Sequence, residues 1–156
     1  MKIWLVIVLA IPLLISCDGS KHYEQINTLP PEGWDVNNRQ SFTFDISDNK
    51  TPYNVFIDVR NRNEYAYKNL FLFLECTGPD SVFVRDTFEC VLAGVDGRWY
   101  GSGFGDLWDA RVPYKMNLQF PKEGEYTIEI EQAMRHENLE GISEIGLRIE
   151  KTKANN

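Results

Sequence analysis

The sequence predicts an all-β domain, an antiparallel β-sandwich of the immunoglobulin-like or jelly-roll-like kind, behind a cleaved export signal. Apolar and polar residues alternate with a period of two in several short runs, turn-forming residues separate these runs, and no segment shows a long helical period. Runs of this kind without crossover helices form two packed antiparallel sheets of about seven or eight strands. A closed barrel is the alternative arrangement of the same strands.

The N-terminal segment, residues 1–16, has the pattern of a signal peptide. Lys2 gives it a positive start, and the apolar run that follows is interrupted by Pro12. This run is shorter than the about 20 apolar residues that a membrane span needs, and the chain turns polar directly after Cys17. We therefore expect the segment to be removed from the mature protein.

Cys17 is predicted to carry a lipid. The residues from Leu14 to Cys17 match the lipobox of bacterial lipoprotein precursors, in which a small residue, here Ser16, precedes a cysteine that is acylated before cleavage. The alternative is an ordinary secretory signal followed by an incidental cysteine. Two or three acyl chains would attach the protein stably, since each buried methylene contributes about 0.8 kcal/mol. The sequence thus predicts an exported protein anchored to a membrane.

The mature chain, residues 17–156, has the length of one domain. We expect residues 17–40 to be a lipidated tether, because a stiff proline turn and a polar run precede the first alternating run, and residues 41–156 to be the sandwich. Loss of Lys2 changes the net charge from −7 to −8, since no acidic residue precedes Asp18. An acidic domain without basic runs repels phosphate backbones, so no nucleic acid partner is expected.

The expected strands follow the alternation along the chain. Their apolar faces are Phe42, Phe44 and Ile46; Tyr53, Val55, Ile57 and Val59; Met116, Leu118 and Phe120; Tyr126, Ile128 and Ile130; and Ile145, Leu147 and Ile149. Most residues between them are polar, with Phe56 as an exception, which is typical of half-buried antiparallel strands. The separating turns are 47–52, 78–80, 96–97 and 121–124. Residues 132–142 instead have the spacing of one or two helical turns.

Residues 67–77 and 82–91 are expected to form a hairpin. Leu70–Leu74 is apolar on both faces, which predicts a central strand whose outer face is covered by loops or by a partner. The hairpin would place Cys76 and Cys90 about seven residues apart along the strands, at about 3.3 Å each. A disulfide needs Cα atoms about 4.4–6.8 Å apart. We therefore favour two unpaired apolar side chains over a bridge in another register.

The residue pattern predicts no enzyme. The two histidines, His22 and His136, lie in polar segments, whereas a histidine zinc site takes three or four protein ligands. Gly101–Gly105 has the spacing of neither a phosphate loop nor a nucleophile elbow. We expect no catalytic residue, no metal and no cofactor other than the covalent lipid on Cys17.

Four aromatic residues around this glycine-rich loop form the candidate partner contact: Trp99, Tyr100, Phe104 and Trp108. Aromatic rings bury large areas and recur at recognition surfaces, so they suit a protein partner or sugar rings. The alternative is that they close the end of the sandwich as part of its core. The glycines favour an exposed loop, which a plain core contact would not require.

Short segments along nearly the whole chain match the pattern of one known family. They are Leu29-Pro30, Gly33-Trp34, Asn54–Asn61, Tyr67–Leu72, Asp96–Trp99, Gly101–Gly103, Phe120–Tyr126, Gln132–Arg135, Asn138–Ile142 and Gly146–Glu150. Together with the lipobox, these segments resemble the gliding-motility lipoprotein GldH family of Bacteroidetes.

This resemblance implies a lipid-anchored, non-enzymatic accessory or structural component of the gliding motility and type IX secretion machinery. It implies a location in the cell envelope, on the periplasmic face of the inner or outer membrane, and envelope proteins of that machinery as partners. The family supplies no catalytic residue to assign to this chain. The alternatives are a surface glycan-binding β-sandwich lipoprotein that uses the aromatic loop, and a hydrolase with an unidentified pair of acids.

The predicted lipidation can be tested at Cys17 itself. Cys17→Ala should leave an uncleaved or mislocalised precursor, because both acylation and cleavage depend on this thiol. Metabolic labelling with a fatty-acid analogue measures the attachment, and the wild-type chain should take up the label. Label retained on the Cys17→Ala protein would contradict the predicted lipid attachment.

Overall fold

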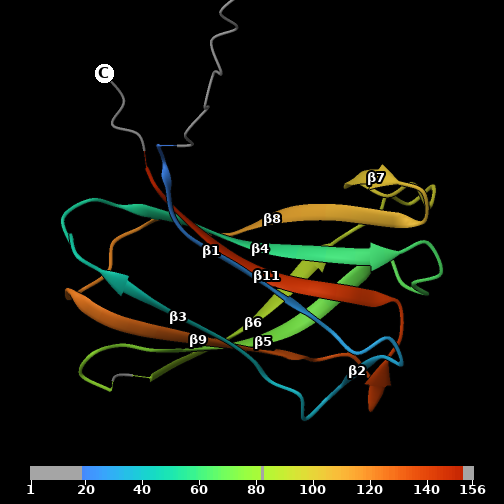
Figure 1. Cartoon of the computed structure of the whole chain (residues 1–156), viewed down its shortest axis with the longest axis horizontal. Coiled ribbons are helices and arrows are strands. Elements are labelled where there is room, and N and C mark those ends of the chain that lie inside the picture. Colours follow the sequence, from blue (N-terminus) through green and yellow to red (C-terminus); the bar gives the residue numbers. More distant parts are fainter. Residues whose placement is uncertain (1–18, 82, 153–156) are drawn as a thin grey trace, which may run out of the picture.

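The computed structural model describes residues 19–81 and 83–152. Within them the chain forms eleven strands and no helix, and hence no helix that could cross a membrane. The strands build two stacked antiparallel sheets, seen as an upper and a lower layer in Figure 1. The prediction of an all-β antiparallel sandwich is confirmed. The predicted signal peptide, residues 1–16, and the predicted lipid site, Cys17, lie outside the described residues.

Each layer has a simple strand order. The five-stranded sheet runs, from edge to edge, through β1 (Lys21–Thr28), β11 (Ile142–Lys151), β4 (Tyr53–Arg62), β8 (Leu107–Leu118) and β7 (Ser102–Phe104). The four-stranded sheet runs through β3 (Gln40–Ile46), β9 (Gly124–Gln132), β5 (Asn69–Thr77) and β6 (Phe83–Val91). A small ladder joins β2 (Trp34–Asp35) with β10 (Asn138–Leu139).

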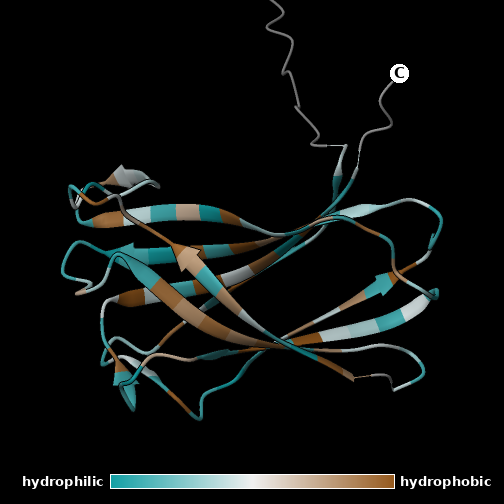
Figure 2. Ribbon diagram, turned by 180° about the vertical axis from the view of Figure 1, so that it is seen from behind, coloured by the Kyte–Doolittle hydropathy of each residue, from teal (hydrophilic) through white to brown (hydrophobic). Residues whose placement is uncertain are grey.

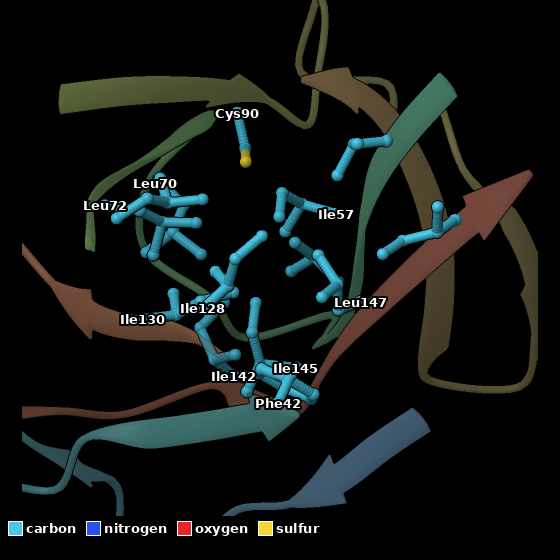
Figure 3. Packing of buried hydrophobic residues seen from close by; sticks show 14 of the residues in the cluster. Phe42, Ile57, Leu70, Leu72, Cys90, Ile128, Ile130, Ile142, Ile145 and Leu147 are labelled. Atoms are coloured by element: carbon cyan, nitrogen blue, oxygen red, sulfur yellow. The ribbon is translucent and has the colours of Figure 1, made fainter. Parts of the chain in front are cut away.

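The apolar faces predicted from the alternation point into the space between the two sheets. Along β4 and β9, buried residues alternate with partly exposed ones over most of each strand, and Figure 2 shows this alternation as bands of hydropathy. In Figure 3, Ile57 and Leu147 of the five-stranded sheet face Leu70, Leu72 and Ile130 of the other sheet. Their shared apolar layer is the core that holds the sheets together.

β5 is the strand predicted to be apolar on both faces, and it lies inside its sheet, between β9 and β6. Its core-facing leucines are buried. On the outer face, the Phe73 ring lies 4.7 Å from the guanidinium carbon of Arg85. At the edge of the strand, the Phe71 backbone amide donates to the Met134 sulfur at 3.3 Å. A side chain from the neighbouring strand β6 therefore covers part of this face, while Phe71 stays 37% exposed.

The predicted tether over residues 17–40 is wrong for most of its length. Residues 21–28 form β1, which pairs with β11 at seven positions, and Trp34 is fully buried. Most side chains of β1 are partly or fully exposed on both faces, because an edge strand is stabilised by backbone pairing more than by an apolar face. The folded domain therefore begins near residue 21, and residues 18–20 alone separate Cys17 from the first strand.

The charged side chain of Glu24 also binds β1 to its sheet. The carboxylate of Glu24 accepts hydrogen bonds from Arg148 of β11 and Arg111 of β8, both at 2.9 Å. The hydrogen bond from Arg148 holds the pKa of Glu24 below its ordinary value. Arg111 in turn binds Asp58 of β4 through two hydrogen bonds, at 2.7 and 2.9 Å. Polar contacts on the outer face thus join β1 to β11, β4 and β8.

Two smaller expectations are also corrected. Residues 132–142 contain no helical turn but a loop and β10, which pairs with β2. The strand count exceeds the predicted seven or eight because β1 and the short strands β2, β7 and β10 were not anticipated.

The predicted hairpin of β5 and β6 is present, with Leu70 opposite Cys90 and Cys76 opposite Val84. Both cysteines are free, as the hairpin geometry predicts. Burial raises the pKa of the Cys90 thiol to about 12 and also raises that of Cys76. Both thiols are therefore protonated at neutral pH and act as small apolar side chains.

The strand register predicts opposite responses from two neighbouring residues of β9. Ile128→Ala should lower the free energy of unfolding by about 2–5 kcal/mol, because the side chain is buried in the core. Glu129→Ala should cost less than about 1 kcal/mol, since this carboxylate lies on the outer face and forms an exposed ion pair. Denaturant unfolding of the mature chain measures both, and equal effects would contradict the register.

Candidate functional site

The aromatic loop, residues 98–108, lies at one end of the five-stranded sheet. Its short strand β7 pairs with the start of β8, where β4 also ends opposite Leu107. The first strand enters the sheet at the other end, where Lys21 pairs with Glu150 and β4 begins. The ten residues of β4, at about 3.3 Å each, separate the two ends by roughly 30 Å. Figure 1 shows β7 and the start of β1 well apart.

Two of the four predicted contact residues are exposed. Phe104 is 93% exposed at the end of β7, and Tyr100 is 68% exposed just before that strand. Gly105 follows Phe104 with a φ of 66°, so the chain reverses into β8 in a conformation that favours glycine. The turn leaves the phenyl ring of Phe104 in solvent, where it contributes little to the core.

The other two predicted contact residues pack against the domain. Trp99 is half-buried, its ring centroid lies 6.4 Å from that of Tyr65, and its indole nitrogen donates to the Asn63 side-chain oxygen at 3.3 Å. The Trp108 ring lies directly on Gly103, where any side chain would overlap it. Trp99 and Trp108 therefore fit the alternative interpretation, in which the aromatic rings pack as part of the domain.

A charged residue lies near the exposed Tyr100, since the Asp96 carboxylate and the Tyr100 hydroxyl both approach Gly94. Val95, in the turn that precedes the loop, is almost wholly exposed, and Asp96 and Arg98 form an open ion pair at 3.8 Å. Aromatic side chains are enriched at protein-protein contacts, and the rim of such contacts is polar. Exposed aromatic rings near charged groups are suited to contact with another molecule.

Among the described residues, the two histidines and the two cysteines contact different neighbours. The His22 ring nitrogen Nε2 lies 2.7 Å from the Asp45 carbonyl oxygen, and His136 contacts the Tyr67 hydroxyl. Cys76 and Cys90 face different neighbours in the hairpin. In the described part of the chain, no group of three or more histidine, cysteine or acidic side chains is placed to hold a metal ion.

Comparison with known proteins gives a consistent result. Residues 21–149 match the family model described as GldH lipoprotein. The chain is 35% identical over 154 residues to a gliding motility lipoprotein GldH homolog of Christiangramia forsetii, with 94% of each chain covered. It is 32% identical over 152 residues to the gliding motility lipoprotein GldH of Flavobacterium johnsoniae, with 93% of this chain and 94% of the relative covered.

Similarity to solved structures is remote. The VP2 subviral particle of infectious bursal disease virus aligns with a TM-score of 0.38 and 11% identity, over 88% of this chain and 31% of the viral chain.

The division between packed and exposed rings predicts different effects on stability. Trp108→Ala should lower the free energy of unfolding by about 2–4 kcal/mol, somewhat less than the about 3–5 kcal/mol for a fully buried tryptophan. Phe104→Ala should change it by less than about 0.5 kcal/mol, because its ring is in solvent. Thermal and denaturant melts compare the two variants. A large loss with Phe104→Ala would show that the loop packs differently.

Proposed function

Because this chain belongs to the GldH lipoprotein family, we propose that it is a non-enzymatic, lipid-anchored component of the gliding motility and type IX secretion machinery. Membership of this family makes it a gliding motility lipoprotein, and therefore a membrane-anchored protein of the cell envelope. The proposal adds that it works by contact with other envelope proteins, and that it serves secretion as well as motility.

The exposure of Phe104 and Tyr100 is the observation that carries this proposal. A stable fold gains little from aromatic rings in solvent, and such rings beside charged groups favour a protein contact. The loop lies at the far end of β4 from the strand that follows Cys17. A lipid on Cys17 would therefore hold the domain by one end and leave the loop accessible.

The separation of the reactive side chains supports a function without catalysis. The thiols are buried or half-buried with raised pKa values, and the two imidazoles contact different parts of the fold. Attachment to a membrane also raises the effective concentration of the domain toward partners on the same membrane, so a small contact can remain occupied. A lipid anchor and a contact loop are sufficient for an accessory role.

Cells that lack this chain provide the test. The wild-type lipoprotein and a Met116→Ala variant should restore secretion through the type IX pathway and any gliding of the host, because Met116 is an exposed apolar residue of β8 outside the loop. A Tyr100→Ala/Phe104→Ala double variant should fail at the same protein level in the membrane. Full restoration by the double variant would remove the aromatic loop from the proposed function.

Sugar binding is the second candidate, since exposed rings such as Tyr100 and Phe104 also stack on sugars. It predicts that the isolated protein binds a cell-surface polysaccharide and that Tyr100→Ala abolishes this binding. The proposed machinery contact predicts no such binding, so one titration with purified polysaccharide separates the two functions.

A further inference from the structure

Strand β6 forms one edge of the four-stranded sheet, and we propose that a second copy of this chain pairs with it. The pairing is antiparallel, β6 against β6, and centred on Thr87. It would join the two four-stranded sheets into one continuous sheet across a twofold axis. The inference does not depend on the aromatic loop or on its proposed partner.

The free side of β6 is a regular template for pairing. The strand has nine residues and follows β5 without a register shift, from Asn69 opposite Val91 to Thr77 opposite Phe83. Among the described residues it pairs with no other strand. An edge strand offers a row of N–H and C=O groups to another chain. At the centre of this row, the Thr87 amide bonds to the Asp86 carboxylate of the same copy, and pairing through this amide would exchange that bond for one to the second copy.

The other edges of the sandwich are protected in ways that proteins commonly use against strand addition. β7 is three residues long, and β1 has a register shift near Lys21. The part of β8 that β7 leaves unpaired contains Pro113 and has two register shifts against β4. β3 lies beside β1, with His22 on the Asp45 carbonyl oxygen and Asn27 donating to Gln40 at 3.1 Å. β6 has no proline and no bulge.

The outward side chains of β6 complement those of a second, antiparallel copy of the same strand. With Thr87 opposite Thr87, Arg85 of one copy faces Glu89 of the other. Phe83, 55% exposed, faces Val91, 49% exposed. Opposite charges and apolar pairs directly across two strands stabilise antiparallel pairing, and each pair occurs twice in this arrangement. This complementarity favours a second copy over an unrelated extended segment.

The core-facing side of β6 accepts the same register. Val84 lies opposite Cys90, which joins two apolar side chains. Asp86 lies opposite Phe88, but its carboxylate is held within its own copy by Lys115 at 2.7 Å and Tyr114 at 3.2 Å. The hydrogen bond from Lys115 lowers the pKa of Asp86. The positive charge of Lys115 compensates this carboxylate, so the interface between the two copies contains no unpaired charge at this position.

The twofold pairing also fixes how the copies sit relative to their lipids. β6 begins at the end of the sandwich where β1 begins. Phe83 pairs with Thr77, and Thr77 with Thr127 near the start of β9. β9 in turn starts opposite Ile46, and His22 of β1 contacts the neighbouring Asp45 carbonyl oxygen. The two chain starts therefore lie at opposite ends of the joined sheet. Both lipids reach one membrane when the joined sheet lies along its surface, and confinement to that surface favours association.

Cysteine crosslinking in native membranes tests the pairing. In the full lipidated chain, Thr87→Cys places two thiols across the twofold axis, and mild oxidation should give a band of twice the mass that a reductant removes. Ser41→Cys is the matched control, since it lies exposed on β3, the other edge of the same sheet. It should remain monomeric, as should the wild type with its native Cys76 and Cys90. A monomeric Thr87→Cys chain, or equal crosslinking from Ser41→Cys, would overturn the proposal.

Charge placed at the same two positions gives a second test without oxidation. Two differently tagged copies of the full chain should co-purify from mixed-expression membranes. Thr87→Lys in both copies should abolish this, because like charges then face each other, whereas Ser41→Lys should not. Unchanged melting temperatures would exclude unfolding as the cause, since both side chains are exposed. Co-purification of the Thr87→Lys copies at the wild-type level would contradict β6 pairing.

Discussion

The apolar layer between the two sheets is the interaction on which the rest of this domain depends. Side chains from β4 and β11 meet those of β5 and β9 there, and each fully buried aliphatic side chain contributes about 1.5–3 kcal/mol. Successive residues of a strand point to opposite faces, so this layer also fixes the register of the strands whose side chains line it. The loops and outer faces are free of that constraint, and they carry the features that point to function.

β1 supplies few side chains to this layer but connects it to the start of the mature chain. Its pairing with β11 and the contacts of Glu24 with Arg148 and Arg111 make it part of the sheet. A lipid on Cys17 would then be joined to the sandwich by a few residues instead of a long tether. The position of the aromatic loop and of the β6 edge relative to the membrane would follow from the fold itself.

The sequence was informative wherever burial produces a period of two, as in β4 and β9. It could not reveal β1, because an edge strand that is largely exposed on both faces is held by backbone hydrogen bonds that leave no hydropathy pattern. The spacing of apolar residues in 132–142 suggested helical turns, but Leu139 is buried through the pairing of β10 with β2. The aromatic cluster was visible in the sequence, whereas the contact between Trp108 and Gly103 that separates packed from exposed rings is a tertiary feature.

Hydrogen exchange of the mature protein tests most directly the claim that the first strand belongs to the sandwich. Alternate amides from Glu24 to Thr28, those that point toward β11, should exchange as slowly as the amides of Ile145 to Ile149, because both sets open only when the sheet opens. Exchange of all β1 amides at the rate of an unstructured chain, beside a protected β11, would contradict this account and restore a flexible tether between lipid and domain.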